Sequence, residues 1–180
     1  PLEWYRPISE PNEVKVVDGT NFSKWTKQEQ LEQCSWDNVN ALYNRNALLN
    51  QPFENVRFGE DMLWAKTCLR NGGRIGYAYH NKVWHYHHYD ATFARKREIS
   101  VLYWRNRVFG ILPKPPEPPS AILFLRTAKT ALRSRPLHIL SVLYWMRYNW
   151  MKAQCKTQAY QEVKDALEKG EKEIDHLYDS

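Results

Sequence analysis

The spacing of hydrophobic and polar positions predicts a helix followed by two strands in the middle of the chain. Residues 62–70 carry apolar side chains at helical spacing, acidic residues precede the first turn, and Gly72-Gly73 follows the last. Negative charge before a helix and glycine after it are typical helix boundaries. Residues 74–79 and 82–88 are rich in aromatic and β-branched side chains, so we expect two strands there.

The flanking segments give weaker patterns. We expect a short helix over residues 23–34, a short strand running into a helix over residues 35–50, and a basic helix over residues 91–107. The proline-rich stretch that follows predicts a stiff connector. These patterns divide the chain into residues 1–112, a connector at 113–120, and a helical tail at 121–180.

Charge is separated within that tail. Residues 118–161 contain no Asp or Glu and seven Lys or Arg, whereas residues 162–180 contain seven acidic residues and three lysines. The acid-free part interleaves its cations with Leu, Ile, Trp and Tyr. This composition is typical of a helix on an anionic membrane surface, and a helical hairpin packed on the rest of the protein is the alternative. We expect no nucleic-acid partner, because the cations stand among large aliphatic residues and no binding module is recognisable.

Composition limits the class of protein. The chain has 180 residues and a net charge of +6. Hydrophobic residues make up 43% of it, which is too many for a disordered chain. Its three cysteines fit neither a disulfide framework nor a cysteine-based zinc site, so we expect a reducing, cytoplasmic setting. No leader is visible, and the longest apolar stretches are shorter than the ~20 residues that cross a bilayer.

Two adjacent carboxylates are the first candidates for chemistry. Glu60 and Asp61 begin the predicted helix, where the helix dipole favours their ionised, hydrogen-bond-accepting form. That form suits a general base or a metal contact, although acidic residues also cap helices without any further role. Trp64 follows one turn later and can form a sugar platform beside them or pack in the core.

Two histidines are the second candidate. On a strand, His85 and His87 would share one face and could hold one divalent ion together with carboxylates from elsewhere. A partly buried, hydrogen-bonded histidine pair or a solvated edge strand is the alternative. A histidine-based metalloprotein would require tight metal binding by this chain alone.

The order of these segments closely resembles family 2 glycosyltransferases. The matching residues are Val39-Asn40-Ala41, Arg45, Pro52-Phe53, Gly59-Glu60-Asp61-Met62-Leu63-Trp64-Ala65, Gly73 and Val83-Trp84-His85-Tyr86-His87. They resemble the carboxy-terminal half of the catalytic domain and lie within residues 36–113. The resemblance implies an α/β fold: a partial GT-A (Rossmann-like) domain lacking its N-terminal half, followed by an α-helical tail.

The resemblance also implies an inverting transfer of sugar from a nucleotide-sugar donor to a glycan or lipid-linked acceptor. Asp61 would match the general base, Glu60 would support it, and Trp64 would line the acceptor pocket. Asn40 and Arg45 would contact substrate. His85, and less directly His87, would contact a divalent ion, Mg²⁺ or Mn²⁺, on the donor diphosphate.

One departure from the family pattern concerns the residues before the match. Only thirty-five residues precede it, and they contain no Asp-x-Asp metal motif. We therefore expect a piece of a longer enzyme that is inactive alone and whose missing half holds most of the metal. From the basic tail we expect the enzyme to be peripheral on the cytoplasmic membrane face. The alternative is a non-catalytic basic module that binds a membrane or a partner, with structural His and Asp residues.

Overall fold

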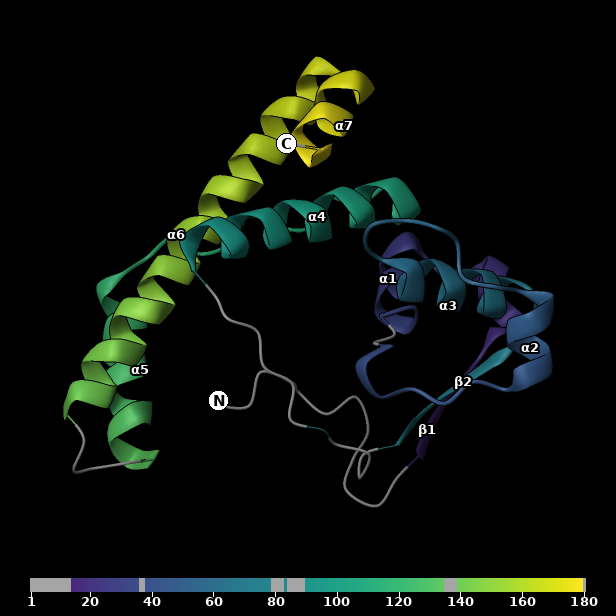
Figure 1. The fold of residues 1–180 in the computed structure, drawn as a ribbon, viewed down its shortest axis with the longest axis horizontal. Coiled ribbons are helices and arrows are strands. Elements are labelled where there is room, and N and C mark those ends of the chain that lie inside the picture. The colour runs from purple at the N-terminus through teal and green to yellow at the C-terminus, as the bar shows by residue number, and fades with distance from the viewer. Residues whose placement is uncertain (1–13, 36–37, 79–82, 84–89, 135–138, 180) are drawn as a thin grey trace. The chain divides into compact units, whose positions relative to one another are not determined.

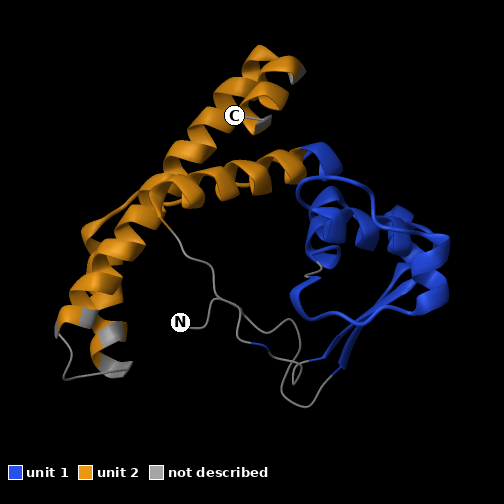
Figure 2. Cartoon of the chain, viewed as in Figure 1, with its two compact units in different colours: residues 1–87, 107–111 blue, residues 88–106, 112–180 orange. Residues whose placement is uncertain are grey.

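The structure is a computed structural model that describes residues 14–35, 38–78, 83, 90–134 and 139–179 (Figure 1). The chain divides into two compact units (Figure 2). Unit 1 comprises residues 1–87 and 107–111, and unit 2 comprises residues 88–106 and 112–180. Most of the basic helix near residue 100 therefore belongs with the tail.

Unit 1 contains the described strands and several short helices. Its elements are β1 (Val14–Asp18), the 3-10 helix η1 (Gly19–Lys24), α1 (Lys27–Gln33), the 3-10 helix η2 (Asn38–Asn40), α2 (Arg45–Asn50), α3 (Glu60–Arg70) and β2 (Arg74–Ala78).

The two strands form an antiparallel ribbon with one buried side. Their register is Val14↔Ala78, Lys15↔Tyr77, Val16↔Gly76, Val17↔Ile75 and Asp18↔Arg74. Val17 and Ile75 are both buried, and as a directly opposed pair they face the same side. Beyond the strands, the Gly19 amide donates to the Gly73 carbonyl at 2.9 Å. The ribbon thus contributes one apolar face to the core of unit 1.

Helix α3 packs directly against the turn after β1. Leu69 has no exposed surface, and a Cβ atom at Gly19 would lie 2.0 Å from the Leu69 carbonyl oxygen. A side chain at position 19 would therefore collide with the backbone of α3. This close approach fixes the depth of α3 in unit 1.

Helix α1 begins at a reciprocal cap and carries a buried side. The Glu29 amide donates to the Thr26 hydroxyl at 3.2 Å, and the Thr26 amide donates to the Glu29 carboxylate at 2.7 Å. The Thr26 amide and hydroxyl both donate to the Glu29 carboxylate and lower the pKa of Glu29. Leu31 and Cys34 are buried, and burial raises the pKa of the Cys34 thiol to about 12. Cys34 is therefore protonated at neutral pH and serves as an apolar packing group.

Lys66 joins α3 to the end of the longer helix α4 (Ala91–Phe109), whose last residues belong to unit 1. Its ammonium group donates to the Val108 carbonyl and lies 5.1 Å from the centre of the Phe109 ring. Desolvation lowers the pKa of Lys66. A cation at the C-terminus of α4 also stabilises the partial negative charge of that helix end.

Unit 2 is helical in all its described elements. After α4 come α5 (Ala121–Ser134), the long α6 (Ile139–Lys169) and α7 (Glu171–Asp179). Gly170, with φ of 117°, allows the chain to reverse between α6 and α7.

The core of unit 2 lies where α4 meets the C-terminal half of α6 and α7. The buried members are Ile99, Leu102, Tyr103, Ala159, Val163, Ala166 and Ile174. Tyr103 stacks on Tyr178 at 4.4 Å and donates to the Asp175 carboxylate at 2.7 Å. Arg95 also donates through two nitrogens to the Glu162 carboxylate. Aromatic stacking and paired charges thus fix α4 on the other two helices.

The N-terminal half of α6 packs against α5 instead. The Asn149 amide donates to the Thr127 hydroxyl at 3.1 Å, and the Phe124 ring meets the Trp150 ring edge to face at 6.3 Å. Early residues of α5 therefore contact late residues of this half of α6, as in an antiparallel helical hairpin. We call α5 and residues 139–151 of α6 the α5–α6 hairpin.

The expectation of an α/β, partial GT-A (Rossmann-like) fold is wrong. Helices make up 69% and strands 7% of the part of the chain that the structure describes, with a single two-stranded sheet. A Rossmann-like fold needs several parallel strands joined by helical crossovers, whereas β1 and β2 pair antiparallel. The motif that suggested the fold occupies one helix and one strand, and two strands of 5 residues cannot form a sheet covered on both faces.

Several predicted elements are confirmed and others are not. The helix at 62–70 is confirmed as α3, the strand at 74–79 as β2, and the helix at 91–107 as α4. The strand expected within residues 35–50 is wrong for the described residues, which form η2 and α2 there. Most of the strand expected at 82–88 lies outside the described residues.

Among the described residues, no helix is both long enough and apolar enough to cross a membrane.

We predict that Leu69→Ala lowers the free energy of unfolding of unit 1 by about 2–5 kcal/mol, because it leaves a cavity beneath α3. Leu42→Ala is the matched control, since Leu42 is 92% exposed in the same unit. Its effect is expected to stay within about 0.5 kcal/mol. Urea unfolding followed by far-ultraviolet circular dichroism measures both, and equal effects would contradict this packing.

A second prediction concerns Lys152 on α6. Burial, with repulsion from Lys156 in second place, lowers the pKa of the Lys152 ammonium from 10.5 to about 8. Between these two values the unfolded chain binds more protons than the folded chain, so the free energy of unfolding of unit 2 rises with pH. Below pH ~8 both states are protonated and the full penalty of burying the charge remains.

Lys152→Met is therefore expected to raise the melting temperature at pH 7 and to flatten the rise in stability between pH 8 and 10. Lys164→Met is the control on the same helix, because the Lys164 side chain is 49% exposed. Thermal melts at half-unit pH steps measure both variants. An unchanged pH profile in Lys152→Met would show that this amine is not the group responsible.

Candidate functional site

Asp61 lies at the start of α3 and holds a preceding loop in place. One carboxylate oxygen accepts the Met62 amide at 2.7 Å, and the other accepts the Asn38 amide at 3.3 Å. Asn38 opens the η2 turn, which also contains Asn40. The carboxylate therefore connects the first turn of α3 to the turn that carries the other predicted substrate contact.

Local sequence explains why Asp61 stands there. Gly59 has a φ of 80°, a left-handed conformation that brings the chain sharply into the helix, and Glu60 and Asp61 form the first turn. Amide groups in this turn have no partner within the helix, so a carboxylate there stabilises them. Glu60 and Asp61 are both partly exposed, which leaves the site open to solvent on one side.

Trp64 is the centre of an aromatic cluster one turn further along α3. Its ring lies 4.8 Å from Tyr43 and 6.3 Å from Phe53, measured between ring centres. Its indole N–H donates to the Gln51 carbonyl at 2.7 Å, and the Gln51 side chain donates back to the Trp64 carbonyl at 2.8 Å. With 8% of its surface exposed, Trp64 holds the loop over residues 38–53 against α3.

Arg45 and Asn40 occupy exposed positions in that loop. Arg45 is the first residue of α2, whose N-cap Asn44 accepts the amides of Asn46 and Ala47. A cation at a helix N-terminus is unfavourable for the helix itself, because the dipole is positive there. Helix stability therefore does not account for Arg45 at this position.

The described residues do not fit a metal site. No group of three or more His, Cys, Asp or Glu side chains comes together among them. The candidate ligands His85 and His87 lie outside the described residues. The Mg²⁺ or Mn²⁺ site stays a prediction.

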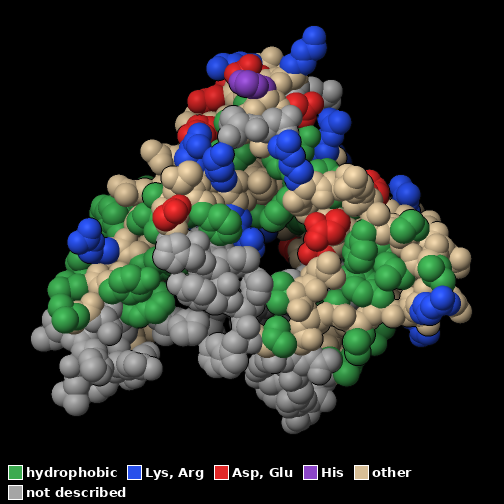
Figure 3. Space-filling model, in the orientation of Figure 1, with side chains coloured by type: hydrophobic (Ala, Val, Ile, Leu, Met, Phe, Trp, Pro, Cys, Tyr) green, Lys and Arg blue, Asp and Glu red, His purple; other side chains and the backbone are tan. Residues whose placement is uncertain are grey.

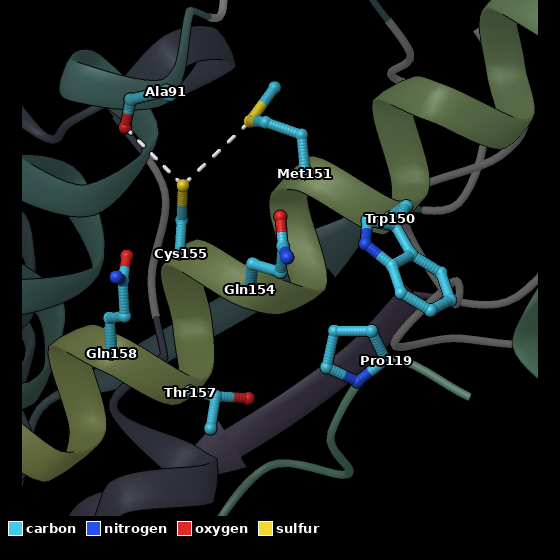
Figure 4. Close-up of a pocket in the computed structure, with 8 residues that line it drawn as sticks. All are labelled: Ala91, Pro119, Trp150, Met151, Gln154, Cys155, Thr157 and Gln158. Atoms are coloured by element: carbon cyan, nitrogen blue, oxygen red, sulfur yellow. Dashed lines mark hydrogen bonds between the residues drawn. The ribbon is translucent and has the colours of Figure 1, made fainter.

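A shallow cavity of about 440 Å³ lies elsewhere, in unit 2 beside Cys155 (Figure 4). The Cys155 thiol contacts the Ala91 carbonyl oxygen at 3.4 Å and the Met151 sulfur at 3.7 Å. Desolvation raises the pKa of this thiol, although the nearby Arg95 opposes the shift. A buried, protonated thiol is a poor nucleophile, so the cavity carries no catalytic group of this kind.

The sequence pattern did not predict three residues of the site. Asn38 donates its amide to Asp61, Tyr43 donates its hydroxyl to the Asn38 side chain at 3.1 Å, and Gln51 pairs with Trp64. Tyr43 and Gln51 lie in segments without clear periodicity. The only signal was the nearness of Asn38 and Tyr43 to the matched residues 39–41 and 45.

Comparison with known protein families, with curated proteins and with solved structures finds no match to this chain. The case for a function therefore depends on the residues and their geometry.

We predict that Trp64→Phe lowers the free energy of unfolding of unit 1 by about 1–3 kcal/mol, because the partly buried Gln51 carbonyl loses its donor. Trp25→Phe is the matched control, since Trp25 is a half-buried tryptophan that packs on Phe22 in the same unit. We expect a smaller effect there. Denaturant unfolding of both variants measures the difference, and a larger loss in Trp25→Phe would contradict the anchoring role of Trp64.

Proposed function

We propose that this chain is part of an inverting glycosyltransferase that moves a sugar from a nucleotide-sugar to a glycan or lipid-linked acceptor. The observation that carries the proposal is the position of Asp61. Its carboxylate is partly exposed at the N-terminus of α3 and is oriented by two backbone amides, from Met62 and Asn38. An oriented carboxylate with solvent access is the geometry that a general base requires.

In the proposed reaction, Asp61 accepts the proton of an acceptor hydroxyl as its oxygen attacks the anomeric carbon. The bond from that carbon to the donor phosphate oxygen breaks, and the nucleoside diphosphate leaves with the bonding electrons. One displacement inverts the anomeric centre. Glu60, on the same helical turn, would stabilise the acceptor or the proton on Asp61.

Two further features support substrate binding beside Asp61. Asn40 is exposed in the turn that Asp61 anchors, where an amide can bond to sugar hydroxyls. Arg45 is an exposed cation at the start of α2 and suits a diphosphate. Trp64, being buried, would act by holding this loop in place, with its partner Tyr43 nearer the η2 turn.

The activity test uses the intact protein as the cell produces it. Asp61→Asn keeps the shape of the side chain and one of its two accepting oxygens but removes the base, so transfer should fall by about 10²–10⁴-fold. Release of nucleoside diphosphate from a panel of nucleotide-sugars, with a membrane-lipid and glycan extract as acceptor, measures the rate. Donor affinity should stay within about threefold, because binding and proton transfer are separate steps.

Asp90→Asn is the matched control for this substitution. Asp90 also accepts an amide at a helix start, from Phe93 at 2.7 Å, but it lies before α4 rather than in the candidate site. Its replacement should leave the transfer rate unchanged. Wild-type turnover in Asp61→Asn would exclude Asp61 as the base.

A second candidate function is a non-catalytic module that binds a membrane or a partner. The bonds from Asp61 to two backbone amides favour it, because they satisfy a purely structural role as well. The panel assay separates the two functions, since such a module would release no nucleoside diphosphate in any variant.

A further inference from the structure

The outward side of α5 is apolar. Ile122 and Leu125 are each 67% exposed and Leu132 is 45% exposed. Together with exposed Lys129 they recur at intervals of three and four residues, so they share one side of the helix. In an ordinary surface helix this stripe would face the core.

The side of α5 that meets α6 includes a polar residue. Thr127 is 6% exposed and is the one buried polar residue among the described side chains. It accepts a hydrogen bond from Asn149 of α6 and donates to the Leu123 carbonyl at 2.9 Å. Because Thr127 fixes which side of α5 meets α6, the apolar stripe is held outward.

The facing part of α6 repeats this arrangement. Leu140 is 83%, Leu143 49% and Tyr144 56% exposed, whereas Val142, on the other side of the helix, is buried. Exposed Arg147 continues the outward side one turn later. Hydrophobic side chains, with basic ones beside them, are visible along the α5–α6 hairpin at the left of Figure 3.

A shallow apolar groove of about 360 Å³ opens on this surface. It is lined by Phe124, Arg147, Trp150 and Met151. Tryptophan and arginine together are typical of the boundary between lipid tails and headgroups, because the ring enters the apolar layer and the guanidinium reaches phosphate.

The charge of residues 118–161 indicates what kind of partner could cover the exposed apolar side chains of the α5–α6 hairpin. Residues 118–161 contain seven Lys or Arg and no Asp or Glu, and acidic residues begin again at Glu162. An acid-free, cationic and apolar surface complements an anionic, apolar one. Nucleic acid supplies the charge but no apolar layer, whereas a bilayer of anionic lipid supplies both.

We propose that the α5–α6 hairpin is a peripheral docking surface for an anionic lipid bilayer. Its exposed leucine and isoleucine side chains enter the acyl boundary, and Arg126, Lys129 and Arg147 contact lipid phosphates. This inference is independent of the proposed sugar transfer, and it supplies that reaction with a location at a membrane face.

Flotation with vesicles tests the docking surface. The intact protein is mixed with phosphatidylcholine vesicles or with vesicles containing one-third phosphatidylglycerol, and the bound fraction gives a partition coefficient. We expect binding to the anionic vesicles, weakening with salt, and at least tenfold less binding to the neutral ones.

Paired variants separate the apolar and the ionic parts. Ile122→Ser with Leu125→Ser should lower the partition coefficient at least tenfold, because two exposed apolar side chains are lost. Arg126→Gln with Lys129→Gln should lower it roughly 25-fold, at about fivefold per charge. All four side chains are exposed, so circular dichroism should show unchanged folding.

The controls carry the same chemical changes in unit 1. Leu42→Ser removes a 92% exposed leucine, and Lys24→Gln with Arg70→Gln removes two exposed cations. Neither should change vesicle binding by more than about twofold. If the control variants lost vesicle binding to the same extent, binding would not depend on the α5–α6 hairpin, and the proposal would be overturned.

Three other results would also overturn it. One is binding that is indifferent to lipid charge. The second is a stable dimer, seen by sedimentation, that Ile122→Ser with Leu125→Ser dissociates, since a second copy would then cover the hairpin. The third is preferential binding of a 20-nucleotide single-stranded RNA over anionic vesicles, with the same loss on Arg126→Gln with Lys129→Gln.

Discussion

The candidate site depends on how deeply α3 is buried in unit 1. The backbone of Gly19 approaches the Leu69 carbonyl so closely that no side chain fits between them, and Leu69 itself is fully buried. This contact fixes the C-terminal end of α3. The N-terminal end is fixed by Asp61 and Trp64, which hold residues 38 and 51 by hydrogen bonds. Each end of one helix of 11 residues therefore orients a different part of unit 1.

In unit 2, the long helix α6 has two kinds of surface. The C-terminal half of α6 buries Ala159 and Val163 against α4 and α7, with Tyr103 and Arg95 supplying the polar contacts. The N-terminal half buries little beyond Val142 and the contact with Thr127, and it leaves its leucines outward. The acidic residues begin at Glu162, within the part of α6 that packs. Packing and charge therefore separate a structural end of α6 from an end available for binding.

Sequence reasoning was most successful where a few neighbouring residues decide the outcome. Acidic residues at 60 and 61 and glycines at 72 and 73 mark the two ends of α3, and the aromatic and β-branched run after them forms β2. It failed on the fold class, because the resemblance was carried by one helix and one strand. The number and direction of strands in a sheet depend on pairing between distant segments, such as Val17 with Ile75. The sequence did not predict the partners of Asp61 and Trp64 either. Asn38 and Gln51 lie in loops without periodicity and contact α3 from a distance along the chain.

The sequence by itself determined the approximate boundaries of α3 and α4 and the acid-free run of cations. Those properties follow from local backbone preferences, caps and composition, which act over a few residues. Only the tertiary structure decided which side of α5 is buried. The stripe at 122, 125 and 132 would normally face the core, yet Thr127 and Asn149 meet there instead. A helix can bury only the side that a neighbour covers, and the neighbour is set by contacts between segments far apart in the chain.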